Sequence, residues 1–227
     1  MVDFDELIDQ YLMRETKGKK IGIYYPSEVG RCLRKIWYSY KYPMEVKPEL
    51  RKIFKMGEIL HDFIAEVLSS EKTPGVELLG VEVPVKMEME DFVVSGRVDD
   101  LMLIRESGKK ILVEVKSTKD VDRVKKPGEH HEAQIQFYMY AKGIHDGMLV
   151  YVDRRDLRTK SFPIPYNEEK AKEVMERFKK LHYHLTNDTP PEPEAKKVLW
   201  MNWMCKYCEY ADRCERDLND ECQVNTT

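Results

Sequence analysis

Residues 91–117, DFVVSGRVDDLMLIRESGKKILVEVKS, decide the fold of this 227-residue chain. Both ends of the stretch, residues 91–105 and 110–117, are rich in the β-branched and apolar residues that favour strands. The link between them is polar and contains a glycine, which is typical of a tight turn. The stretch therefore predicts two strands joined as an antiparallel hairpin.

Charged residues interrupt the apolar pattern of this hairpin, and three of them are candidates for a functional site. Glu114 and Lys116 are two residues apart in the second strand, and side chains alternate along a strand, so the two share one face. Buried charges are unfavourable, and an isolated Glu-x-Lys most often lies on a strand edge that faces water. Asp99, on the preceding strand, favours a different interpretation. Together the three side chains are suited to hold a divalent metal ion and a water against a phosphate.

The sequence on either side of the hairpin predicts helices and further strands. Ser27, after Pro26, is expected to be the N-cap of a helix that continues to residue 40. The expected helices cover residues 3–13, 28–40, 49–70, 129–143 and 167–187. The expected strands cover residues 78–89, 91–105, 110–117, 147–153 and 159–164.

Two of these helices carry further candidate site residues. Gln134 and Tyr138, four residues apart, share one face of the helix after the hairpin, although both are compatible with ordinary packing. His61 lies beside the apolar face of the helix before the hairpin, where a histidine is more often a core-edge residue than a ligand. His130 and His131 are expected to be exposed and are assigned no metal.

The ordered set G-x-x-D, E-x-K and Q-x-x-x-Y resembles the RecB-like branch of the PD-(D/E)XK nuclease superfamily. The resemblance implies an α/β fold of the restriction-endonuclease type, with a mixed sheet flanked by helices. It assigns catalysis to a triad of Asp99, Glu114 and Lys116. It also implies that Gln134 and Tyr138 position the DNA backbone.

The same resemblance implies a metal-dependent reaction on DNA. RecB-like nucleases place a metal-binding histidine on a helix before the sheet, where this chain has His61. The implied ligands of Mg²⁺ or Mn²⁺ are His61, Asp99, Glu114 and the backbone carbonyl of Val115. Lys116 would orient the attacking water or stabilise the charge of the transition state.

Five cysteines in a chain whose N-terminus is unlike a secretory signal argue against a disulfide framework. Cys205, Cys208 and Cys214 are clustered, and a tetrahedral sulfur site would need a fourth ligand, for which Cys32 is the candidate. Spacing alone allows zinc or iron–sulfur equally. Cys32 as a buried small apolar residue is the alternative. Cys222 is left as a free thiol.

The cysteine pattern around such a core resembles the CRISPR-associated RecB-family exonucleases. That resemblance implies an iron–sulfur cluster, usually 4Fe–4S, on the four cysteines Cys32, Cys205, Cys208 and Cys214. It implies an exonuclease that acts on single-stranded DNA ends and trims new spacers beside the CRISPR integrase. A repair or viral recombination nuclease with the same site is one alternative. A non-catalytic DNA-binding scaffold is another, and the complete triad counts against it.

Charge and aromatic residues bear on how DNA would be bound. The net charge of −3 provides no overall basic footprint, so contacts with DNA would come from local basic patches, such as those at residues 31–35, 119–126 and 154–160. Four aromatic residues near the cysteines are expected to shield the cluster from water, with stacking on bases as the alternative. They are Trp200, Trp203, Tyr207 and Tyr210.

The chain is expected to be a cytoplasmic protein, because its N-terminus is unlike a secretory signal and it lacks an apolar run of about 18 residues that could span a membrane.

We expect the chain to form three regions. Residues 1–75 form a helical region that carries Cys32 and His61, and residues 76–188 form the nuclease core. Residues 189–227 form a linker and a cluster-binding tail that packs with the N-terminal region.

Overall fold

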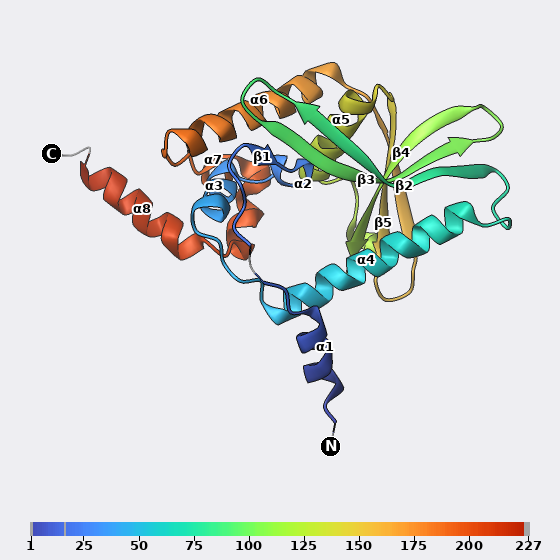
Figure 1. The fold of residues 1–227 in the computed structure, drawn as a ribbon, viewed down its shortest axis with the longest axis horizontal. Coiled ribbons are helices and arrows are strands. Elements are labelled where there is room, and N and C mark those ends of the chain that lie inside the picture. Colours follow the sequence, from blue (N-terminus) through green and yellow to red (C-terminus); the bar gives the residue numbers. More distant parts are fainter. Residues whose placement is uncertain (1, 16, 225–227) are drawn as a thin grey trace.

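The structure is a computed structural model that describes residues 2–15 and 17–224, with side chains described as far as residue 220. Helices lie on both faces of a six-stranded sheet (Figure 1). The strands are β1 (Ile23–Tyr24), β2 (Val76–Glu88), β3 (Val93–Ile104), β4 (Lys109–Thr118), β5 (Asp146–Asp153) and β6 (Thr159–Pro165). The α-helices are α1 (Phe4–Leu12), α2 (Pro26–Val29), α3 (Leu33–Lys41), α4 (Pro48–Ser69), α5 (Glu129–Lys142), α6 (Glu168–Thr186), α7 (Glu194–Lys197) and α8 (Ala211–Val224). The 3₁₀ helices are η1 (Val121–Arg123) and η2 (Leu199–Tyr207).

Strand β3 is the centre of the sheet. It pairs antiparallel with β2 along one edge. Along its other edge it pairs first with the short parallel strand β1 and then, from Asp100 to Ile104, with antiparallel β4. The predicted hairpin is therefore confirmed. Strand β5 is parallel to β4, which requires a crossover connection, and α5 provides it.

The two faces of β4 pack against different helices. Val113 and Val115 pack with residues of α4, whereas Leu112 belongs to the main core with residues of α5 and α6. Burial on both faces explains why this strand is almost continuously apolar. The mixed sheet flanked by helices confirms the fold class expected from the sequence.

The predicted helix over residues 28–40 is wrong in one respect, because the chain forms two helices there. Ser27 lies inside α2, and Cys32 is the N-cap of α3. The interruption lies against α5: a Cβ atom on Gly30 would come within 2.3 Å of the His130 Cα atom. The carbonyls of Val29 and Arg31 near the break accept hydrogen bonds from the Arg177 guanidinium at 2.8 and 2.7 Å.

Helix α4 buries less of its apolar face than its periodicity predicts. Leu60 and Ile64 are buried, but Ile53 and Met56, in the half of the helix nearer α1, are exposed. Figure 1 shows this half extending away from the sheet towards α1. No helix in the described part of the chain is both long and apolar enough to cross a membrane.

The N-terminal helices contact the C-terminal tail directly. The Tyr38 ring stacks on that of Tyr210, and the Tyr38 hydroxyl donates to Asp217 at 2.6 Å. The Tyr210 hydroxyl donates to the Tyr42 carbonyl at 3.0 Å, and Lys35 forms an ion pair with Glu209. Both ends of the chain therefore contribute to one packed region. The region boundaries at residues 75/76 and 188/189 stay a prediction.

Candidate active site

The hairpin strands β3 and β4 separate at Asp99. Their last paired residues are Asp100 and Val113. Beyond this pair the Asp99 carboxylate, rather than the backbone of β3, accepts the Val115 N–H at 2.7 Å. Its other oxygen lies 3.3 Å from Nδ1 of His61 on α4. Burial lowers the pKa of His61, but the hydrogen bond and charge of Asp99 outweigh burial, so the net pKa is raised.

The Glu114 side chain is 2% exposed, against 16% for that of Asp99. Its Oε1 accepts hydrogen bonds from Lys116 Nζ and Gln134 Nε2, both at 2.6 Å. Its Oε2 is buried and has no hydrogen-bond partner among the described residues. Burial raises the pKa of Glu114 above its usual range.

Helix α5 presents Gln134 and Tyr138 to the same cluster. The Gln134 amide oxygen accepts from Lys116 Nζ at 3.1 Å, and its nitrogen also donates to the Tyr138 hydroxyl at 3.3 Å. Burial raises the pKa of Tyr138 above its usual range. Gly96 makes this packing possible, since a Cβ there would lie 2.8 Å from Pro26 and 3.2 Å from the Tyr138 hydroxyl. The glycine of G-x-x-D is thus required because Pro26 and Tyr138 lie too close to this position for a side chain to fit.

The structure therefore brings together six of the side chains predicted for the acidic site, while the role of the Val115 carbonyl as a ligand stays a prediction. His61 comes from α4, Asp99 from β3, Glu114 and Lys116 from β4, and Gln134 and Tyr138 from α5. In the part of the chain that the structure describes, no three His, Cys, Asp or Glu side chains form a ready-made metal site. The donor set nevertheless fits a hard divalent ion, because carboxylate oxygens suit Mg²⁺ and Mn²⁺ and Glu114 has a buried oxygen without a partner.

Sequence reasoning missed the buried acid Asp100, which is next to Asp99. It is 1% exposed, and neither of its carboxylate oxygens is hydrogen-bonded to a described residue. Burial and the neighbouring Asp99 raise its pKa to about 7. Two successive aspartates inside an otherwise apolar strand are the signal that could have identified it.

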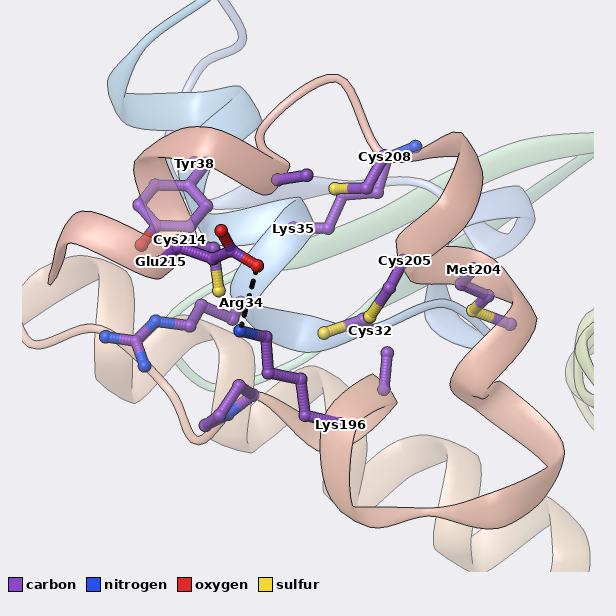
Figure 2. Close-up of a pocket in the computed structure, with 13 residues that line it drawn as sticks. Cys32, Arg34, Lys35, Tyr38, Lys196, Met204, Cys205, Cys208, Cys214 and Glu215 are labelled. Atoms are coloured by element: carbon purple, nitrogen blue, oxygen red, sulfur yellow. Dashed lines mark ion pairs between the residues drawn. The ribbon is translucent and has the colours of Figure 1, made fainter. Parts of the chain in front are cut away.

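The four predicted cluster ligands line one pocket of roughly 100 Å³. Figure 2 shows the sulfur atoms of Cys32 and Cys205 facing one another, with Cys208 and Cys214 on the remaining walls. Arg34, which is 1% exposed, also lines the pocket, and its positive charge suits a group held by thiolates. The four cysteines thus share one pocket, although no three of them lie close enough to form a ready-made metal site in the described part of the chain. The side chain of Cys222 lies outside the described residues.

The histidines at the start of α5 are half-buried, so their predicted exposure is wrong. Nδ1 of His131 lies 2.8 Å from the Tyr151 hydroxyl, and the His130 ring packs 5.5 Å from that of Trp203. Burial lowers the pKa of His130 to about 4 and that of His131 to about 2. Both rings are therefore neutral near pH 7. The sequence could not show this, because the covering residues come from β5 and η2.

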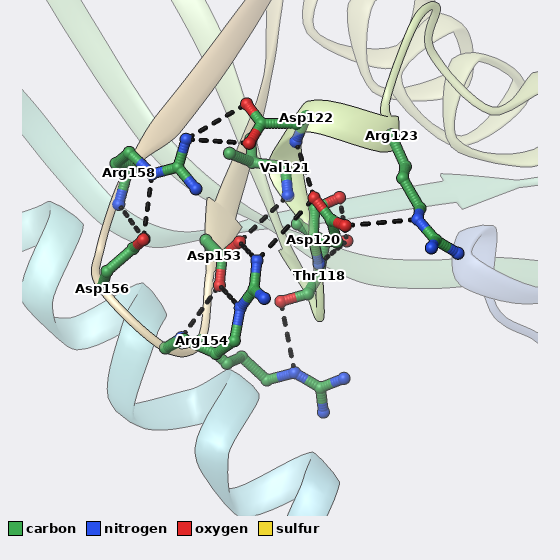
Figure 3. Close-up of polar contacts among 10 residues, drawn as sticks. Thr118, Asp120, Val121, Asp122, Arg123, Asp153, Arg154, Asp156 and Arg158 are labelled. Carbon is green, nitrogen blue, oxygen red and sulfur yellow. Dashed lines mark hydrogen bonds and ion pairs between the residues drawn. The ribbon is translucent and has the colours of Figure 1, made fainter.

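In the basic runs at residues 119–126 and 154–160, the arginines Arg123, Arg155 and Arg158 form ion pairs with aspartates (Figure 3). Asp153, which is fully buried, accepts from the Val121 N–H at 3.0 Å and from the Arg155 guanidinium at 3.0 and 2.9 Å. Arg158 forms ion pairs with Asp122 and Asp156. These arginines therefore hold η1 against the end of β5.

This fold and cluster define a nuclease, and the chain belongs to the PD-(D/E)XK nuclease superfamily, whose family model matches residues 26–215. The chain is similar to the CRISPR-associated exonuclease Cas4 of Saccharolobus solfataricus, with 22% identity over 93% of this chain and 100% of the relative. It is also similar in fold to the crystal structure of SSO0001. That similarity has a TM-score of 0.63 and 23% identity, and it covers 92% of this chain and 95% of the other.

Proposed function

We propose that the protein is a Mg²⁺- or Mn²⁺-dependent DNA exonuclease that acts on single-stranded ends. One observation carries the proposal: the buried, unpartnered Glu114 Oε2 lies within a cluster that also holds Asp99, Lys116 and His61. An unpaired buried carboxylate oxygen is unfavourable unless a ligand satisfies it. A binding module has no need of such a group.

The residues divide the work of hydrolysis among them. His61, Asp99, Glu114 and the carbonyl of Val115 would hold the ion. When bound, the ion polarises the scissile phosphate and lowers the pKa of its water. Lys116, held by Glu114 and Gln134, donates to the attacking water or to the developing negative charge.

Gln134 and Tyr138 position the DNA strand. Both are nearly buried, and the Tyr138 hydroxyl is held by Gln134, so their polar groups are fixed before substrate arrives. Such preorganisation lowers the barrier because the groups need not be ordered during the reaction.

We further propose that the four pocket cysteines bind an iron–sulfur cluster of the 4Fe–4S type. Their shared pocket and the buried Arg34 support this assignment. Cys32 belongs to the N-terminal helical region that we propose for residues 1–75, and the other three cysteines belong to the tail that we propose for residues 189–227. A cluster bound by all four thiolates would therefore join these two regions beside the nuclease core that we propose for residues 76–188.

The biological role that we propose is trimming of new spacers in the cytoplasm, beside the CRISPR integrase. The support is the 22% identity to a CRISPR-associated exonuclease over the whole length of that relative. Adjacency of the gene to those of an integrase would favour this role over DNA repair or viral recombination.

The direct test compares linear and circular single-stranded DNA, each with Mg²⁺, with Mn²⁺ and with chelator. We expect metal-dependent degradation of linear strands, resistance of circles, and no activity of Asp99→Ala. Asp91→Ala is the matched control, since Asp91 is an exposed aspartate just before β3. Cleavage that persists in chelator or in Asp99→Ala would contradict the proposal, and equal loss of circles would show an endonuclease.

A further inference from the structure

A second pocket, of roughly 190 Å³, lies beside the cysteine pocket. The two pockets share two lining residues, Lys35 and Met204, both labelled in Figure 2. The lining residues of the second pocket are Arg31, Lys35, His130, Trp203, Met204 and Tyr207. It combines three aromatic rings with two basic side chains.

The aromatic rings of this pocket are open to solvent. Trp203 is 47% and Tyr207 78% exposed, and their ring centres lie 6.4 Å apart. Tyr210, in contrast, is 4% exposed and packs in the same hydrophobic cluster as Cys208 and Cys214, and the shielding role of the tail aromatics stays a prediction. Large exposed rings grouped around a hollow are typical of a binding site.

The charge around the pocket is suited to an anionic strand. Arg31 is exposed and forms no ion pair with any residue that the structure describes, whereas Lys35 is paired with Glu209 at 2.7 Å. His130 is neutral near pH 7, because burial and the nearby positive charges of Arg31 and Lys116 lower its pKa to about 4. Arg31 is therefore the cation that is free to contact a phosphate.

The pocket adjoins the candidate active site through α5. His130 precedes Gln134 by four residues, so the two lie on the same side of the helix about 6 Å apart along its axis. Gln134 contacts both Glu114 and Lys116. If the scissile phosphate of a DNA strand lies at Glu114 and Lys116, the neighbouring nucleotide of that strand would therefore lie close to the pocket.

We propose that this pocket binds an unpaired nucleobase of the DNA strand next to the scissile phosphate. Trp203 and Tyr207 stack on the base, and Arg31 contacts its backbone phosphate. Stacking accepts any base, because every base has an aromatic face. A base in a duplex is already stacked and paired, so the pocket favours single strands. This inference rests on the proposed nuclease function and specifies how that site selects its substrate.

The test measures binding of a fluorescently labelled thymidine oligonucleotide to the full-length protein in chelator, where no cleavage is expected. Trp203→Ala should weaken binding about tenfold, and Trp203→Phe should retain most of the affinity. Trp200→Ala is the matched control: the same residue type on the same helix η2, 43% exposed, but outside the pocket. Arg31→Ala should reduce the slope of log affinity against log salt by about 0.7, the effect of one phosphate contact.

Tyr207→Ala keeps the test independent of folding, because a side chain that is 78% exposed contributes little packing. It should weaken binding to the single strand and leave binding to a blunt duplex unchanged. Equal affinities of the parent, Trp203→Ala and Tyr207→Ala would overturn the inference. If cleavage still requires Asp99, the proposed function survives that result. Conversely, stacking without any metal-dependent cleavage would support the pocket and refute the nuclease.

Discussion

The Asp99 carboxylate accepts the backbone N–H of Val115 at 2.7 Å, at the point where β3 and β4 stop pairing. A side chain thus replaces the backbone bond of the ladder, and the same carboxylate also contacts His61 of α4. Asp99 is therefore both a structural residue and a candidate ligand. Substitution of Asp99 would therefore alter both the strand geometry and the candidate metal site, whereas substitutions of Glu114 and Lys116 test the chemistry more directly.

Glu114→Gln and Lys116→Met should each reduce cleavage on the order of 100-fold or more, as expected for loss of a metal ligand or a charge stabiliser. Their melting temperatures should stay close to that of the parent. Gln keeps the volume of Glu114, and burial already favours protonation of Glu114 when Lys116 is absent. Steady-state cleavage rates and thermal unfolding measure the two effects. Lys119→Met, at an exposed lysine just after β4, is the control. More than about a tenth of parental activity in either site variant would remove that residue from the reaction.

His61→Ala should raise the Mn²⁺ concentration for half-maximal cleavage at least tenfold, the scale of effect expected around a metal site. Affinity for DNA in chelator should be unchanged, because His61 contacts Asp99 rather than the proposed DNA-positioning residues. His145→Ala, at an exposed histidine between α5 and β5, should change neither quantity. An unaltered Mn²⁺ requirement would identify His61 as a core-edge residue that only supports Asp99.

Asp153 should make the protein lose stability in acid. Hydrogen bonds from Arg155 hold the pKa of Asp153 well below its usual range. The unfolded chain takes up the proton near its ordinary pKa of about 3.9, so the stabilisation is present at neutral pH and declines as the pH falls below that value. In urea unfolding, Asp153→Asn should therefore be less stable than the parent at pH 7, with a difference that shrinks towards pH 2. If the difference in unfolding free energy between the parent and Asp153→Asn does not change with pH, Asp153 contributes to stability through packing alone.

Local sequence patterns predicted the centre of this fold correctly. Alternation places Glu114 and Lys116 on one face of β4, and the short turn pairs β4 with β3, so their meeting with Asp99 follows from two neighbouring strands. The spacing of Gln134 and Tyr138 likewise defines one helix face. These inferences needed only contacts between elements adjacent in sequence.

Features that depend on distant segments could not be predicted. The helix break at Gly30 exists because α5 passes 2.3 Å from where its Cβ would be, about a hundred residues later in the chain. The burial of His130 depends on η2, and Ile53 is exposed because its half of α4 extends away from the sheet (Figure 1). Neither has a signature in the local hydropathy.

The cysteine pocket connects the two ends of the chain, which leads to a prediction about colour and stability together. If the thiolates of Cys32, Cys205, Cys208 and Cys214 bind iron and sulfide, the anaerobically purified protein should be brown and contain both. Serine at any of these positions should then bleach the protein and lower its melting temperature, because the binding free energy of the cluster is also folding free energy. The loss should be partial, since Tyr38–Asp217 and Lys35–Glu209 also hold the ends together. Cys222→Ser is the control and should do neither. Stoichiometric zinc without iron would assign the pocket to a structural zinc site, whereas a colourless, metal-free protein of unchanged stability would show that the four thiols bind no metal at all.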